Sequence, residues 1–166
     1  MHVIALPGRS SETEEWLRRL LVAGELPVRN IVQYRHWQSE VEASVTFEAS
    51  RLEGQAPQLV VAKSMGTVIA ATAFDLHEFR PHAAVLIGTP YSALPSAERR
   101  LLQKFAQAVS TLFIQQTADP GGSAAGLLAA LQLTRGEVAA VPGDDHLYSD
   151  TPALGAILKQ WKQNRS

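Results

Sequence analysis

The sequence predicts an α/β fold, a three-layer sandwich in which a mostly parallel six-stranded sheet carries helices on both faces. Short apolar runs alternate with segments of helical periodicity along the whole chain. Right-handed crossovers between parallel strands leave helices on each side of such a sheet. The 166 residues, 46% of them hydrophobic, can bury about two-thirds of their unfolded surface around one core. We therefore expect residues 1–166 to form a single domain.

The expected strands are short apolar runs that end at a turn signal. Pro7 and Gly8 stop the first run, Gly88 begins the break after the fourth, and Pro142 and Gly143 follow the last. The six predicted strands cover residues 3–6, 28–34, 59–62, 83–87, 111–115 and 138–141.

The expected helices carry apolar residues three or four positions apart, which places them on one face. Ser10 or Ser11 can cap the first helix, several Glu residues lie near its positive end, and Gly24 ends it. The other predicted helices cover residues 41–52, 65–76, 96–108, 124–133 and 152–161.

The stretch 59–70 holds the sharpest turn in the pattern. An apolar strand runs into Ser64, and a helical segment follows at once, with Ala62 and Gly66 as small residues on either side. A Ser at such a turn adopts strained backbone geometry that lifts its hydroxyl above the sheet edge, and it needs small neighbours. The usual pattern is G-x-S-x-G, so Ala62 is a departure. The plainer interpretation of Ser64 is a helix cap.

Reactive side chains follow several of the predicted strands. In parallel sheets, ligands bind beyond the carboxyl ends of the strands. Ser64 follows the third predicted strand, Asp119 follows the fifth, and His146 follows the sixth. A nucleophile, an acid and a base therefore occur in that order at one edge of the sheet.

On these residues the chain resembles the α/β-hydrolase superfamily across essentially its whole length. It is most similar to the small single-domain serine hydrolases that lack the first two strands of the larger fold. The family order is Ser, then Asp or Glu, then His. The resemblance therefore implies a catalytic triad of Ser64, Asp119 and His146, without a metal or cofactor. The short segment 88–96 stands where larger relatives insert a lid domain, so we expect none here.

The resemblance also implies an oxyanion hole built from backbone N–H groups. One donor would be Met65, directly after the nucleophile, and the other would come from the Gly8–Arg9 turn, with Arg9 as the expected residue. Many relatives carry His-Gly in this loop, so Pro7 is a departure. Gly8, Tyr91 and Leu147 are the residues we expect to contact the substrate.

Each candidate has a plainer interpretation. Asp119 precedes Pro120 and could simply open a turn, and Asp144 and Asp145 compete with it for the role of the acid. We favour Asp119 because an acid one or two residues before His146 would have difficulty reaching the outer ring nitrogen. Lys63 and Arg9 flank the site and could meet an acidic substrate, but we favour the simpler interpretation that both are solvated charges.

Composition limits the other classes of function. The formal net charge is −1 with scattered Lys and Arg, so we expect neither a nucleic-acid nor a membrane partner. The chain has no Cys, which excludes thiol catalysis and disulfides, and no glycine-rich nucleotide motif follows any strand. Without a recognisable signal peptide or long apolar segment, a cytoplasmic location is expected.

Together these patterns predict a serine hydrolase of the carboxylesterase or thioesterase type. It would act on short or medium acyl esters through an acyl-enzyme intermediate. The alternative is a non-enzymatic binding protein that keeps the α/β-hydrolase scaffold, because a fold alone does not guarantee activity.

Overall fold

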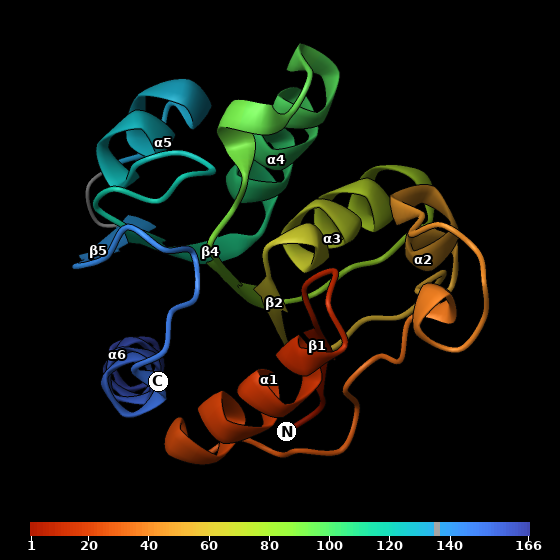
Figure 1. Ribbon diagram of the computed structural model, residues 1–166. Coiled ribbons are helices and arrows are strands. Elements are labelled where there is room, and N and C mark those ends of the chain that lie inside the picture. The colour runs from red at the N-terminus through yellow and green to blue at the C-terminus, as the bar shows by residue number, and fades with distance from the viewer. Residues whose placement is uncertain (135–136) are drawn as a thin grey trace.

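A computed structural model describes residues 1–134 and 137–166. Its sheet has five strands, all parallel, in the spatial order β1-β2-β3-β4-β5 (Figure 1). This confirms the α/β class with a parallel sheet, whereas the prediction of six strands is wrong. The strands are β1 (Val3–Leu6), β2 (Leu59–Lys63), β3 (Ala83–Ile87), β4 (Ser110–Gln116) and β5 (Val138–Val141).

Helices cover both faces of the sheet, as the alternating pattern predicts. On one face α1 packs against α6, and on the other face α2, α3, α4 and α5 follow one another (Figure 1). The helices are α1 (Glu12–Ala23), α2 (Val45–Ser50), α3 (Met65–Leu76), α4 (Ser96–Ala108), α5 (Ala124–Leu131) and α6 (Thr151–Gln163), with the short 3₁₀ helices η1 (Arg35–Trp37) and η2 (Tyr91–Ala93).

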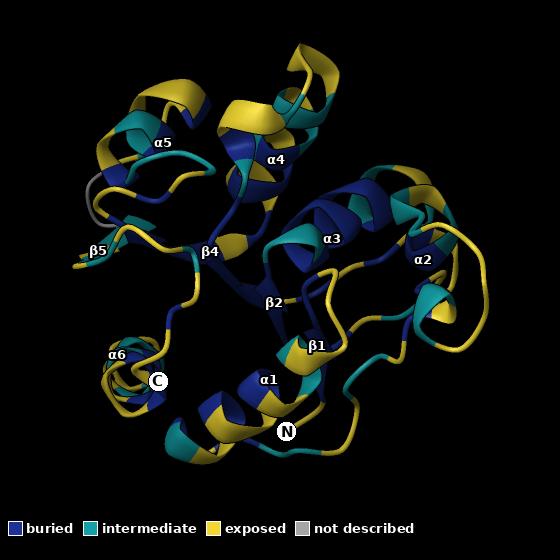
Figure 2. Ribbon diagram, in the orientation of Figure 1, coloured by how far each residue is buried: buried dark blue, intermediate teal, exposed yellow. Residues whose placement is uncertain are grey.

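The core lies in two layers, because successive side chains of a strand point to opposite faces. In β1, Val3 and Ala5 pack with α1 and α6, while Ile4 and Leu6 pack with the helices of the other face. Every residue of β2 and β3 is buried, which explains why their sequences are nearly continuous apolar runs instead of alternating ones (Figure 2).

The segment 28–34 is the predicted strand that does not form. It makes a single bridge, between Ile31 and Ala5, with the Ala5 backbone N–H donating to Asn30 O at 2.9 Å and the Val32 N–H donating to Ala5 O at 3.0 Å. The segment lies on the outer edge of β1, partly exposed, and polar residues interrupt its apolar pattern. A half-exposed edge segment buries too little apolar surface to extend the pairing.

Two predicted helices are shorter than expected. The helix predicted over 41–52 begins only at Val45, where the Ser44 hydroxyl caps it by accepting the Phe47 N–H at 3.1 Å. The helix predicted over 124–133 ends at Leu131 because Gln132 adopts a left-handed conformation with φ 54°. Neither difference moves a strand end.

The order in which successive segments join the sheet reverses at β1. The segment that bridges to Ala5 lies on one side of β1, and β2 pairs with its other side. In open parallel sheets this reversal leaves a crevice at the carboxyl ends of the two strands, where ligands bind. The Gly8–Arg9 turn and Ser64 both lie there. None of the described helices is long and apolar enough to cross a membrane.

Candidate active site

Ser64 occupies the turn between β2 and α3 in a conformation that side chains rarely adopt. Its φ is 51° and its ψ is −113°, and its backbone N–H donates to Ile87 O at 2.9 Å. A non-glycine residue in such a region carries backbone strain of roughly 1–3 kcal/mol, which the surrounding structure must offset. The strain accompanies a tight strand-to-helix turn that presents the hydroxyl at the sheet edge.

Gly66 allows the first turn of α3 to lie against the end of β1. A Cβ at this position would collide with the carbonyl oxygens of Leu6 and Pro7, the latter only 2.7 Å away. Ala62, the departure from the glycine pattern, lies inside β2, where it pairs with Leu6 and Leu86 and is fully buried. A methyl group is therefore accommodated at residue 62 but not at residue 66.

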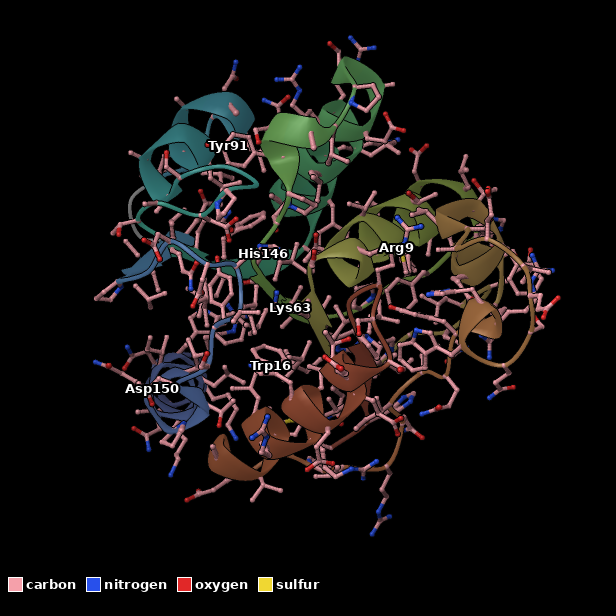
Figure 3. All side chains as sticks on the ribbon, in the orientation of Figure 1. Arg9, Trp16, Lys63, Tyr91, His146 and Asp150 are labelled. Atoms are coloured by element: carbon pink, nitrogen blue, oxygen red, sulfur yellow. The ribbon has the colours of Figure 1, made fainter. Side chains whose placement is uncertain are left out.

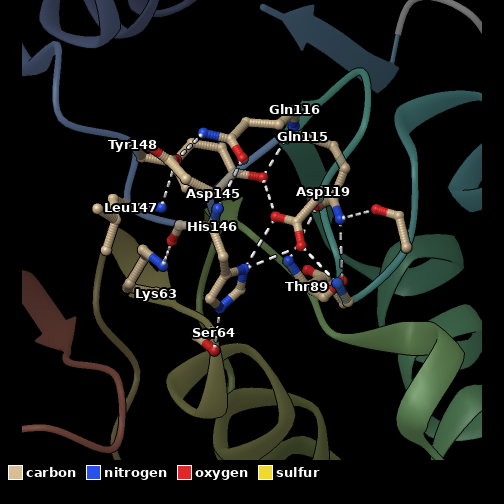
Figure 4. A network of polar contacts seen from close by, with 12 residues as sticks. Lys63, Ser64, Thr89, Gln115, Gln116, Asp119, Asp145, His146, Leu147 and Tyr148 are labelled. Atoms are coloured by element: carbon tan, nitrogen blue, oxygen red, sulfur yellow. Dashed lines mark hydrogen bonds and ion pairs between the residues drawn. The ribbon is translucent and has the colours of Figure 1, made fainter. Parts of the chain in front are cut away.

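Ser64, His146 and Asp119 form one line of hydrogen bonds (Figure 4). Ser64 Oγ lies 2.8 Å from His146 Nε2, and His146 Nδ1 lies 3.0 Å and 2.9 Å from the two carboxylate oxygens of Asp119. A carboxylate only accepts, so Nδ1 carries the ring proton and Nε2 is free to accept the Ser64 hydroxyl proton. The imidazole is thereby held in the tautomer that a general base requires.

The Asp119 carboxylate is completely buried and receives several donors. Besides the His146 ring, the Gly121 backbone N–H donates to it at 2.7 Å and the Tyr148 hydroxyl at 2.7 Å. A buried carboxylate needs such donors, because leaving it unpaired would cost several kcal/mol. Its two oxygens are therefore fixed in position before any substrate binds.

The loop that carries His146 is held by three elements. His146 has φ 62°, its N–H donates to Gln116 Oε1 at 2.9 Å, and its carbonyl accepts from Lys63 Nζ at 2.9 Å. From α1, the Trp16 indole N–H donates to the Tyr148 carbonyl at 2.8 Å. The ring is thus oriented by its backbone as well as by Asp119.

Of the three candidate acids, Asp119 is the one whose carboxylate reaches the His146 ring. Asp145 instead accepts hydrogen bonds from the Gln116 side chain at 3.0 Å and from the Leu147 N–H at 2.9 Å. The bond from Gln116 is the main cause that lowers the pKa of Asp145. Within residues 1–134 and 137–166, the His146 ring forms no hydrogen bond to Asp144 or Asp145.

Three ring-bearing side chains hold the first loop, one at the end of segment 28–34 and two just after it. The Tyr34 hydroxyl donates to Pro7 O at 2.6 Å, while the His36 Nε2 and Trp37 Nε1 groups both donate to Arg9 O, at 2.7 Å and 2.8 Å. The Tyr34 and Trp37 rings also contact each other, with centroids 5.0 Å apart. The conformation of the Pro7–Arg9 loop is therefore fixed by groups outside it.

The two backbone N–H groups expected to form the oxyanion hole have no hydrogen-bond acceptor among the residues that the structure describes. In the described part of the chain, neither the Met65 N–H nor the Arg9 N–H donates to a protein acceptor. Met65 begins α3, so the partial positive charge of the helix N-terminus adds to its donor strength.

A pocket of about 470 Å³ opens directly beside Ser64, between α1 and the His146 loop. Trp16 forms an apolar wall, and the lining also includes Gly8 and Leu147, two of the three residues expected to contact a substrate. Leu147 is 63% exposed, so its side chain lies at the open side. The full lining comprises Gly8, Arg9, Ser10, Glu12, Thr13, Trp16, Arg19, Lys63, Ser64, His146, Leu147 and Ser149.

Lys63 is buried in the wall of this pocket, although its charge suggested a solvated residue. Its ammonium lies 4.9 Å from the Tyr148 ring centroid. It lies 5.7 Å from the ring centroid of Trp16, a residue of α1 (Figure 3). Burial lowers the pKa of Lys63 to about 8, although the negative charges of Asp119 and Asp145 act to raise it. At pH 7 the amine is therefore still mostly protonated.

Tyr91 lies away from the pocket in which it was expected. Its ring packs against Gly122 and Gly126, and its hydroxyl donates to Ser123 O at 3.0 Å, close to α5 (Figure 3). It is absent from the lining of the pocket beside Ser64. Tyr148 is also absent from that lining, and its hydroxyl contacts the Asp119 carboxylate instead.

In comparisons with known proteins, no family model matches this chain, and no curated protein matches it either. The described residues also hold no cluster of three His, Asp or Glu side chains arranged to bind a metal ion. What is shown is an α/β fold with a five-stranded parallel sheet. Because one fold serves many functions, its activity must be inferred from the chemistry of the site.

Proposed function

We propose that this protein is a serine hydrolase of the α/β-hydrolase type that cleaves short or medium acyl esters. One observation carries the proposal: a strained Ser64 whose hydroxyl lies 2.8 Å from a His146 ring that is itself bound to the buried Asp119. A hydroxyl is a poor nucleophile unless a base removes its proton. This arrangement supplies that base and holds it in the required tautomer.

In the first half of the proposed reaction, Ser64 Oγ attacks the ester carbonyl while its proton moves to His146 Nε2. The developing oxyanion accepts hydrogen bonds from the Met65 and Arg9 N–H groups. Losing one such donor typically costs about 2.7–4 kcal/mol of transition-state stabilisation. Collapse of the intermediate breaks the bond to the leaving oxygen, and His146 returns the proton to it. Asp119 stabilises the imidazolium during these steps.

In the second half, water replaces the leaving group beside His146. The imidazole takes a proton from this water as it attacks the acyl-Ser64 carbonyl, and the same two N–H groups bind the second oxyanion. Release of the carboxylic acid restores the Ser64 hydroxyl. No redox step or additional reactant is required.

The open pocket supports small substrates. Its volume of about 470 Å³ lies within the range of small-molecule sites, and the segment after β3 contains only the short η2 before α4. Nothing in that segment is long enough to form a lid domain. The proposal therefore favours short or medium acyl chains over long triglycerides.

Labelling with a fluorophosphonate, which forms a covalent bond only with an activated Ser, tests the proposal. Peptide mapping should find the adduct on Ser64, and Ser64→Ala should abolish it. Ser50→Ala is a matched control, because Ser50 is an exposed residue of α2 and its loss should leave labelling unchanged. A folded protein that is not labelled, or is labelled elsewhere, would contradict the proposal and favour a non-enzymatic binding protein.

A further inference from the structure

The pocket beside Ser64 combines an apolar wall with an excess of positive charge. Trp16 and Leu147 supply the apolar surface. Three cationic side chains but only one carboxylate, that of Glu12, line the same space, although the whole chain carries a formal net charge of −1. The three cations are Lys63, Arg9 and Arg19.

Lys63 is the cation with the most restricted surroundings. Only 3% of the residue is exposed, and among the described residues its amine has one hydrogen-bond acceptor, His146 O. A protonated amine has three N–H donors, so two remain without a protein acceptor. A buried ammonium in this position gains from an acceptor or a negative charge brought into the pocket by a ligand.

The two arginines lie at the solvent side of the pocket. Neither Arg9 nor Arg19 forms an ion pair with any described residue. The neighbouring Arg18 provides a contrast, since it pairs with Glu14 at 3.1 Å and with Glu15 at 3.5 Å and is absent from the pocket lining. Arg9 and Arg19 therefore line the pocket without a carboxylate partner among the described residues, whereas Arg18 is paired and lies outside it.

We propose that this pocket selects esters that carry a carboxylate group, held by Lys63 inside the pocket and by Arg9 and Arg19 at its mouth. The inference rests on the proposed hydrolase function and names its substrate class. The uncharged part of the substrate packs on the Trp16 ring. Cations that line a concave, partly apolar site concentrate an anionic substrate there, which raises the rate of encounter.

The carboxylate can belong to the acyl chain or to the alcohol, and paired substrates distinguish the two. For the acyl side, the nitrophenyl monoester of adipic acid is compared with the ester whose far end is a carboxamide. For the alcohol side, the acetate ester of hydroxybenzoate is compared with that of hydroxybenzamide. Each kcat/KM is divided by the hydroxide-catalysed rate of the same ester, which removes differences in intrinsic reactivity.

In one of the two pairs, we expect the corrected kcat/KM of the carboxylate ester to exceed that of its carboxamide partner by about tenfold at low ionic strength. Added salt should lower this ratio, because salt screens exposed charges. Arg19→Gln should lower this ratio severalfold, and Lys63→Met should lower it further. Arg18→Gln is the matched control, since it removes the same charge from the same helix outside the pocket, and it should keep the ratio.

The outcomes separate this inference from the proposed function. Hydrolysis of all four esters without a preference for the acid overturns the inference and leaves the hydrolase intact. A preference that Arg18→Gln reduces as much as Arg19→Gln also overturns it, because the effect then reflects overall charge. Failure to hydrolyse any ester, together with absent fluorophosphonate labelling, overturns both.

Discussion

The Tyr148 hydroxyl donates a hydrogen bond to Asp119 Oδ2 at 2.7 Å and accepts one from the Gln116 backbone N–H at 2.8 Å. It therefore links the strand that precedes Asp119 to the loop that carries His146. Burial, and then the bond to Asp119, raise the pKa of Tyr148 well above its ordinary value, so the phenol remains a donor throughout the neutral range. The orientation of the acid thus depends on a residue two positions after the His.

Tyr148→Phe removes this link without removing the ring. The Gln116 N–H would lose its acceptor and Asp119 one donor, so we expect a loss of about 1–3 kcal/mol in the free energy of unfolding. The kcat for an ester should fall while KM changes little, because Tyr148 is buried and does not line the pocket beside Ser64. Tyr91→Phe is the control: it also loses a hydrogen bond, to Ser123 O, but should keep kcat. Equal kinetic losses in both variants would contradict this role. Urea denaturation and steady-state kinetics measure the two effects.

Asp119→Asn tests the identity of the acid. An amide in place of the carboxylate favours the wrong tautomer of His146, and a loss of roughly 10³–10⁴-fold in kcat is expected. Asp145→Asn should cost far less, since Asp145 bonds Gln116 and Leu147 instead of the ring. Steady-state ester hydrolysis by the two folded variants decides the question, and a near-normal Asp119→Asn enzyme would exclude Asp119 as the triad acid.

Tyr34→Phe tests whether the first loop must be held in place. The Pro7 carbonyl would lose its buried donor, so we expect the free energy of unfolding to fall by about 1–3 kcal/mol. If the loop supplies an oxyanion donor, kcat should fall by more than the fraction of unfolded protein explains. Kinetics at a temperature where circular dichroism shows full folding separates these effects. An unchanged kcat in the fully folded variant would argue against a catalytic role of the loop.

Lys63 should make stability depend on pH in the alkaline range. The folded-state pKa of Lys63 is about 8, below the ordinary value of 10.5, so between these values the unfolded chain binds more protons. This group therefore makes the free energy of unfolding rise with pH, by about 1 kcal/mol per pH unit at most. The groups facing the amine are the Trp16 and Tyr148 rings, His146, and the Asp119 and Asp145 carboxylates that raise its pKa.

Lys63→Met removes this contribution and serves as the comparison. As pH rises from about 8 toward 10, the free energy of unfolding of the original protein should increase relative to that of the Lys63→Met variant. The raised pKa of Tyr148 acts in the opposite direction only above about pH 10, where an unfolded tyrosine loses its proton. Urea titrations across this window measure the difference, and a constant difference would show that Lys63 keeps its ordinary pKa.

The sequence by itself determined the α/β class, most strand positions, and the edge of the sheet at which Ser64, Asp119 and His146 lie. Local patterns suffice for this, because buried parallel strands are short continuous apolar runs and their carboxyl ends share one edge. The turn pattern also predicted the need for a small residue at Gly66. In the structure, α3 lies so close to the end of β1 that there is no room for a side chain there.

Tertiary structure alone decided the rest. Whether residues 28–34 pair beyond Ile31 depends on their position at an exposed edge, and whether Lys63 is solvated depends on the rings that close over it. Tyr91 and Tyr148 both follow a strand, yet one packs toward α5 and the other bonds Asp119. Such contacts join residues distant in the chain, and their energies depend on burial and partner geometry, which local sequence patterns do not contain.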